Sequence, residues 1–96
     1  PQRSNCASTL RARLRSGVIS AAFWLRDMAR RMTAAGVRIE IEAFDTGHLW
    51  LAKELAKEGA IPAPTLVQLC MGVPWGAPDD LNTFMAMVNN VPTDWN

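Results

Sequence analysis

The residues with the clearest chemical potential lie in one short stretch, VRIEIEAFDTGHLW, which runs from Val37 to Trp50. Its first eight residues alternate in polarity, and this alternation indicates a β-strand. One face is aliphatic, whereas the other carries Arg38, Glu40 and Glu42. A half-exposed strand would send these charges to water. The DTGH that follows is typical of a loop that begins a helix, and a short strand-to-helix turn implies a parallel sheet covered by helices. The direction in which the glutamates point is therefore the central question.

His48 is the single histidine of the chain and a natural candidate for a metal ligand. It falls at the start of the helix expected after the DTG, with no second histidine or cysteine beside it, so helix capping or packing explains it better. Cys6 and Cys70 are far apart and lack the CxxC spacing of a zinc site. Because a catalytic zinc needs about three protein ligands, we expect no metal site within this chain.

The sequence around the acidic strand predicts alternating helices and strands. Helical spacing begins at about Ser20 and stops at Gly36, a residue type that commonly ends helices. A second helix follows the strand, capped by Asp45 or Thr46 and ended by Gly59. The inward residues expected on these two helices are Leu25, Met28, Ala29, Met32, His48, Leu51, Ala52 and Leu55.

A second strand and a third helix complete the pattern. The apolar run LVQLCMGV (66–73) is typical of a strand covered on both faces. DDLNTFMAMVNN (79–90) predicts a helix with two aspartates near its positive N-terminus. Its expected inward residues are Leu81, Phe84, Met85 and Val88. VPTDWN resembles the approach to another strand. This order predicts parallel strands, joined by right-handed crossovers, within a piece of a larger α/β domain.

Length and composition restrict the class of protein. Ninety-six residues suffice for one small domain, and 49% hydrophobic with 20% charged residues are typical of a globular chain. No apolar run approaches the ~18 residues of a transmembrane helix, so we expect no membrane partner. Two distant cysteines and the absence of a signal-type apolar region favour a cytoplasmic location.

Charge is divided unevenly along the chain. Residues 1–31 hold seven arginines and one acid, a net charge of +6, whereas residues 32–96 hold three bases and eight acids, a net −5. The Arg- and Ser-rich segment of residues 1–19 is expected to be irregular, followed by a folded unit over residues 20–96. Its composition is superficially that of an organelle transit peptide. Its charge leaves open a noncatalytic module that binds an acidic surface, although nucleic acid is not expected, because RARLR lacks interleaved aromatic residues.

The signatures of residues 25–96 resemble the β-keto acid cleavage enzymes, the family that includes 3-keto-5-aminohexanoate cleavage enzyme of lysine fermentation. The features are the acidic strand before FDTGH, the AKEGAIPAP loop, Gln68 in a strand that leads into MGVPWGAP, and Trp95. Residues 1–22 lack the Gly-Ser/Thr-x-Asn-Phe-like strand of the family. A shifted or wrongly joined reading frame would produce such a local loss, and the other two frames of the DNA test this hypothesis.

The resemblance implies a zinc-dependent (β/α)8 TIM barrel, of which this chain would supply about strands 5 and 6 with their flanking helices. Such enzymes combine a β-keto acid with acetyl-CoA and release acetoacetate and a new acyl-CoA. The family's zinc ligands and catalytic base would lie outside this chain, which implies that the fragment alone is inactive. The resemblance also implies that the full-length protein is a homo-oligomer. Glu42 matches an inward glutamate that binds substrate, whereas Arg38 and Glu40 would lie deeper and pair with each other or with neighbouring strands.

Two features leave alternatives open. Glu42 could form an ion pair inside the barrel without touching substrate, in which case the segment is a structural remnant. The GVPWG loop would lie beside the site, where its two glycines could cradle a phosphate of coenzyme A or merely form a tight turn. Trp75 stands where the family often has a small residue, so the contact of this loop with the acyl or pantetheine part is not fixed by the resemblance.

Overall fold

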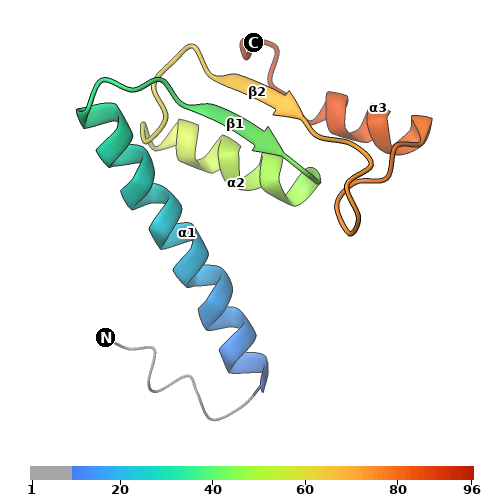
Figure 1. The fold of residues 1–96 in the computed structure, drawn as a ribbon, viewed down its shortest axis with the longest axis horizontal. Helices are drawn as coiled ribbons and strands as arrows, with labels where there is room; N and C mark the ends of the chain where they lie inside the picture. The colour runs from blue at the N-terminus through green and yellow to red at the C-terminus, as the bar shows by residue number, and fades with distance from the viewer. Residues whose placement is uncertain (1–9) are drawn as a thin grey trace.

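The computed structural model describes the backbone of residues 10–96 and the side chains from Ala22 onward. Its elements are α1 (Leu10–Ala34), β1 (Glu40–Ala43), α2 (Thr46–Lys57), β2 (Leu66–Leu69) and α3 (Leu81–Asn89), as Figure 1 shows. The expected alternation of helices and strands is confirmed. Within the described residues, no helix combines the length and the apolar character needed to span a membrane.

α1 begins about ten residues earlier than the sequence pattern predicts. The segment of residues 1–19 was expected to be irregular, yet the backbone is helical from Leu10 onward. The stretch LRARLR consists of residues with high helix propensity, which explains a helix without a clear amphipathic pattern. Residues 1–9 of that segment lie outside the described residues.

β1 and β2 form a parallel pair in which Glu40 lies opposite Leu66 and Glu42 opposite Gln68. The far edge of β2 is also paired. The N–H of Asn96 donates to Thr65 O, and the N–H of Val67 donates to Asn96 O, both at 2.8 Å. This alternation of bonds is that of a parallel ladder. The chain therefore enters a third strand position beside β2, as the VPTDWN segment predicts.

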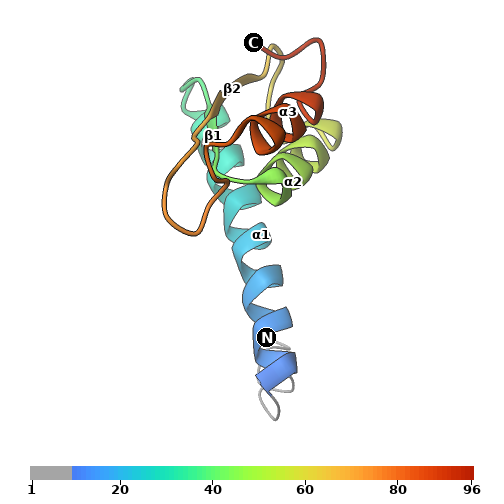
Figure 2. The ribbon, with the colours of Figure 1, turned by 90° about the vertical axis from the view of Figure 1, so that its right-hand side faces the viewer.

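α2 and α3 cover one face of the sheet. The core under them joins Ala43 of β1 and Leu49 of α2 to Ala77 and Met87, with Val67 and Leu69 of β2 packed against it. Figure 2 shows the strands edge-on, with α2 and α3 together on one side. Among the described elements, no helix lies on the opposite face of the sheet, the one with Glu42.

Several expected core positions are wrong. Leu49, one residue after His48, is fully buried, whereas His48 itself is exposed. On α3 the buried residue is Met87. The four residues expected to point inward, Leu81, Phe84, Met85 and Val88, are exposed. A sheet of two strands is too narrow to cover the whole apolar side of α3, and only Met87, which packs with Ala43, Leu49 and Ala77, is buried.

Glycines end α1 and α2 in the same way. Gly36 and Gly59 have φ angles of +74° and +81°, which favour glycine. After α1, Gly36 N–H bonds Thr33 O and Val37 N–H bonds Met32 O; the end of α2 repeats this pattern around Gly59. These are Schellman motifs. The predicted end of each helix is confirmed.

Candidate functional site

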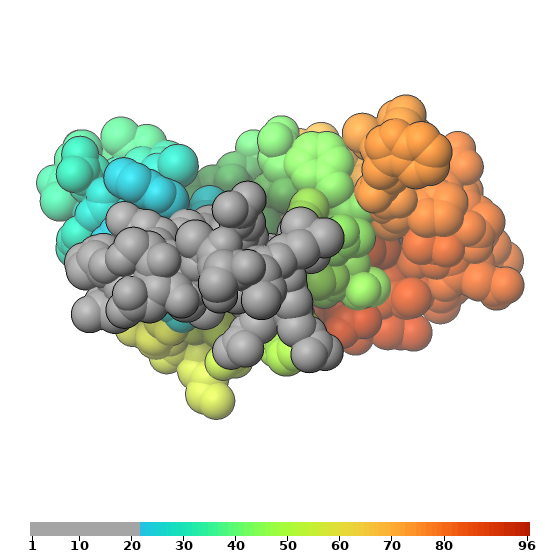
Figure 3. Space-filling model, turned by 90° about the horizontal axis from the view of Figure 1, so that it is seen from below, coloured from blue at the N-terminus to red at the C-terminus, as the bar shows by residue number. Residues whose placement is uncertain are grey.

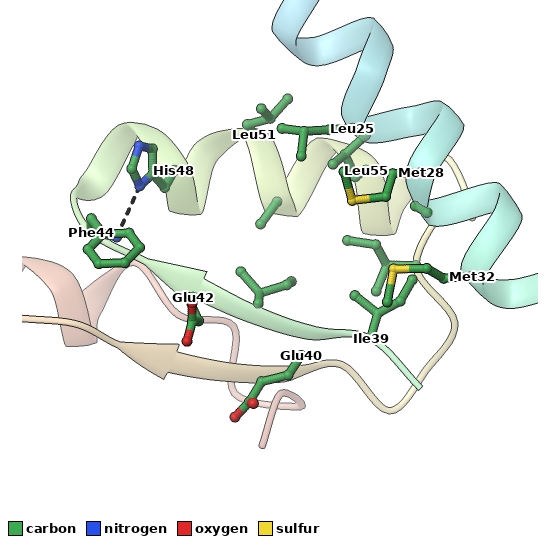
Figure 4. Close-up of a pocket in the computed structure, with 14 residues that line it drawn as sticks. Leu25, Met28, Met32, Ile39, Glu40, Glu42, Phe44, His48, Leu51 and Leu55 are labelled. Carbon is green, nitrogen blue, oxygen red and sulfur yellow. Dashed lines mark hydrogen bonds between the residues drawn. The ribbon is translucent and has the colours of Figure 1, made fainter. Parts of the chain in front are cut away.

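Glu42 lies at the carboxyl end of β1, one residue before the strand finishes. Its register partner is Gln68, and the two exposed side chains share the face that α2 and α3 leave uncovered. In Figure 4, Glu40 and Glu42 point away from α1 and α2, whereas Ile39 points toward α1. The alternating residues of VRIEIEAF therefore give the strand two different faces. One face is aliphatic and packs against the helices, and the other carries the carboxylates.

Glu40 lies two residues deeper on the same face and is exposed. The expected pairing of Arg38 with Glu40 is not seen. The ion pairs among the described side chains join Arg26 to Glu58, two arginines of α1 to Asp27, and His48 to Asp45. Neither Glu40 nor Glu42 has a partner among these groups, so both carboxylates are open to water or to a ligand on this face.

In the turn from β1 to α2, the aspartate and the histidine of DTGH make the hydrogen bonds that stabilise the start of the helix. Asp45 caps α2, since its Oδ1 accepts the N–H of His48 at 3.0 Å. The N–H of Phe44 donates to His48 Nδ1 at 3.0 Å, and the two rings lie edge to face at 6.0 Å. Figure 4 shows this bond as a dashed line. His48 therefore acts in local structure, as the capping interpretation expects, and its Nδ1 is already used as an acceptor.

The loop from β2 to α3 crosses the end of β1. The N–H of Ala77 donates to Phe44 O. Gly76 lies so close that a Cβ at this position would be 2.8 Å from the same oxygen. Figure 2 shows the loop on the side of the sheet opposite α2 and α3. Glu42 is on the same side, because its neighbour Ala43 points into the core under these helices. This contact was not predicted from the sequence, because it joins two segments that lie far apart along the chain.

Trp75 occupies the tip of this loop. Its side chain is 100% exposed, and its φ of 72° lies in the left-handed region that favours glycine. This backbone conformation gives a reason for the small residue expected here; in the present chain a large aromatic residue adopts it.

A hollow lies on the opposite side of β1, between α1, β1 and α2. It has a volume of about 490 Å³. Most of its lining is aliphatic, including Leu25, Met28, Met32, Ile39 and Leu55, which Figure 4 labels. The carboxylates of Glu40 and Glu42 point away from it. This groove therefore belongs to the packing between helices and sheet.

Metal ligands do not converge in the described part of the chain: no group of three or more His, Cys, Asp or Glu side chains could hold a metal ion there. Cys70 is a free, half-buried thiol whose Sγ lies 3.9 Å from Gln68 O. The side chain of Cys6 lies outside the described residues. The donor set for the zinc implied by the resemblance is thus incomplete among the described residues.

Comparison with known proteins identifies the family. The model of the beta-keto acid cleavage enzyme family matches residues 5–96. The 3-dehydrocarnitine:acetyl-CoA trimethylamine transferase of Rhizobium meliloti (strain 1021) is 79% identical over 71 residues, which are 74% of this chain and 24% of that protein. The chain thus spans about a quarter of the length of this curated relative.

These matches support the family, and they do not single out the 3-keto-5-aminohexanoate enzyme named with the resemblance. The family match begins inside the Arg- and Ser-rich segment, whose origin in a shifted reading frame stays a prediction. The chain belongs to the beta-keto acid cleavage enzyme family.

Proposed function

We propose that this chain is a segment of an enzyme that exchanges acyl groups between a β-keto acid and acetyl-CoA, with Glu42 facing the substrate. The observation that carries the proposal is the position of Glu42. Its carboxylate lies at the carboxyl edge of parallel strands, on the face opposite the core residue Ala43 and therefore on the face that α2 and α3 do not cover. In (β/α)8 barrels that face is the lumen, and the active site lies at that edge.

A TIM barrel completed by the rest of a longer protein fits these elements. The strands are parallel, the helices lie on one face, and Asn96 occupies a third strand position beside β2. The chain covers 24% of its relative, so most strands of such a barrel would come from elsewhere. The zinc implied by the resemblance would then also take most of its ligands from elsewhere. When bound, it would polarise the carbonyl oxygens of the keto acid.

The substrate we propose is 3-dehydrocarnitine, with acetyl-CoA as co-substrate. The name of the relative states this pair for that protein, and 79% identity extends over most of the present chain. 3-Dehydrocarnitine and 3-keto-5-aminohexanoate both carry a cation beyond the keto group. An open carboxylate such as that of Glu42 would attract either cation, most strongly where the closed site excludes water.

The exchange breaks one carbon–carbon bond and forms another. The CH₂–COO⁻ part of the keto acid would leave its own acyl group and join the acetyl group of acetyl-CoA, which gives acetoacetate. The remaining trimethylammonioacetyl group would form the new thioester with coenzyme A. Transfer of trimethylamine alone from one molecule to the other would give the same two products. The route therefore has to be tested by the fate of the acetyl carbons.

The experiment uses the whole enzyme that carries these 96 residues, 3-dehydrocarnitine, and acetyl-CoA with ¹³C in both acetyl carbons. Carbon–carbon exchange places the label in acetoacetate, and this is the result that we expect. Label retained in the new thioester would show transfer of trimethylamine and overturn the proposed route. An absence of both products, in a protein that does convert 3-keto-5-aminohexanoate, would overturn the proposed substrate.

A further inference from the structure

Among the residues that the structure describes, no packing contact explains the size of Trp75. It is 100% exposed, so its indole ring contributes nothing to packing within the described residues. Its positive φ of 72° costs conformational free energy that a glycine would avoid. Residues held in disfavoured backbone conformations without a packing reason are concentrated at ligand sites. Trp75 is therefore a candidate for contact with a ligand.

The loop that carries Trp75 is fixed by hydrogen bonds on both sides. The N–H of Gly76 donates to Val73 O at 2.9 Å, and the N–H of Gly72 donates to Ala77 O at 2.8 Å. The bond from Ala77 to Phe44 O ties this turn to the end of β1. In Figure 3 the loop (orange) stands out from the surface beside the segment that follows β1 (green). The tip is thus presented at the carboxyl edge of the sheet, on the side of Glu42.

Together, an indole ring and a carboxylate suit one class of cation. A quaternary ammonium group has no N–H to donate, so hydrogen bonds do not recognise it; aromatic faces do, through cation–π attraction. A primary ammonium group is held well by hydrogen bonds to a carboxylate alone. The aromatic residue therefore adds selectivity for the methylated cation.

We propose that Trp75 contacts the trimethylammonium group of the substrate beside Glu42, and that it selects cationic over neutral β-keto acids. This inference rests on the proposed function. Trp75 is then a specificity-determining residue. The hydrogen bonds from Gly76 to Val73 and from Ala77 to Phe44 hold its loop in position.

The test compares two substrates of equal shape in the whole enzyme: 3-dehydrocarnitine and 5,5-dimethyl-3-oxohexanoate, in which carbon replaces the charged nitrogen. We expect Trp75→Leu to lower the ratio of kcat/KM for the cationic over the neutral substrate about tenfold, with Trp75→Phe in between. Trp50, which is 71% exposed on α2, provides the matched control. Trp50→Leu should leave the ratio unchanged.

The outcomes separate this inference from the function on which it rests. A wild-type enzyme that converts both substrates, with a ratio unchanged by Trp75→Leu, would overturn the inference and leave the proposed function standing. An equal fall for both substrates would also overturn it, because a general contact carries no selectivity for charge. A wild-type enzyme inactive on both would overturn the proposed function and the inference with it.

Discussion

Replacing Gly76 with alanine tests whether the β2–α3 loop is held against the end of β1. The added Cβ would lie 2.8 Å from Phe44 O, 3.3 Å from Phe44 Cβ and 3.4 Å from Val73 O. The closest of these atoms is backbone, so a side-chain rotation cannot relieve the clash. Overpacking of this kind costs about 1–3 kcal/mol. The loop must move outward, which also strains the bond from Ala77 N–H to Phe44 O, worth about 1 kcal/mol.

We therefore expect Gly76→Ala to lower the free energy of unfolding of the whole enzyme by about 2–4 kcal/mol, measured by urea denaturation. The same variant should lower the preference for the cationic substrate, since Trp75 moves with the loop. Gly36→Ala is the matched control, because this glycine has a φ of +74° but nothing within 4 Å of a new Cβ. It should cost about 1–2 kcal/mol from its backbone conformation and leave the substrate preference unchanged. A Gly76→Ala enzyme within about 0.5 kcal/mol of wild type would refute the close approach.

Two further predictions concern the packing that supports the site. Leu49→Ala should lower the free energy of unfolding by about 2–5 kcal/mol because Leu49 is fully buried under β1, whereas Lys57→Ala, at an exposed position of the same helix, should stay within about 0.5 kcal/mol; equal losses in urea denaturation would contradict the packing of α2. The hydrogen bond from Arg26 Nε, at 2.6 Å, lowers the pKa of Glu58. The pair therefore stabilises the fold above the ordinary glutamate pKa of about 4.3, and this contribution is lost as the pH falls through the lowered pKa. Glu58→Gln should flatten that part of the curve of urea midpoint against pH, and an unchanged slope between about pH 5 and pH 3 would count against the ion pair.

Local signals in the sequence predict the elements and most of their ends. Asp45 caps α2 as expected, and Gly36 and Gly59 end their helices, because caps and left-handed glycines act on their immediate neighbours. The strand of residues 37–44 is paired only over Glu40–Ala43, since alternation shows polarity but not where a partner strand begins.

The burial of α2 and α3 could not be read from periodicity alone. On α2, Ala52 and Leu55 are buried as expected, but Leu49 takes the buried position expected for His48, because the Asp45 cap and the Phe44 bond to His48 Nδ1 hold the histidine outside. On α3, periodicity finds the apolar side but not how much of it a sheet of two strands covers. The distant contact between Ala77 and Phe44 has no local signal at all.

The candidate site, too, is predictable from the sequence only in part. The alternation predicts that Glu42 lies on the face opposite the aliphatic side chains, and the structure agrees. The role of Glu42 toward substrate stays a prediction. Trp75 is conspicuous in the sequence only as a departure from the family pattern. Its exposure and its backbone conformation become known only when the loop is folded against β1.

The central claim is tested most directly by comparing Glu42→Gln with Glu40→Gln in the whole enzyme. Both substitutions keep the size and remove one charge, on the same face of the same strand. We predict that kcat/KM for 3-dehydrocarnitine falls about 10- to 100-fold for Glu42→Gln, as the loss of a charge-assisted contact implies, and far less for Glu40→Gln. Equal kinetics of the Glu42→Gln and wild-type enzymes would contradict the account and leave Glu42 as part of the scaffold.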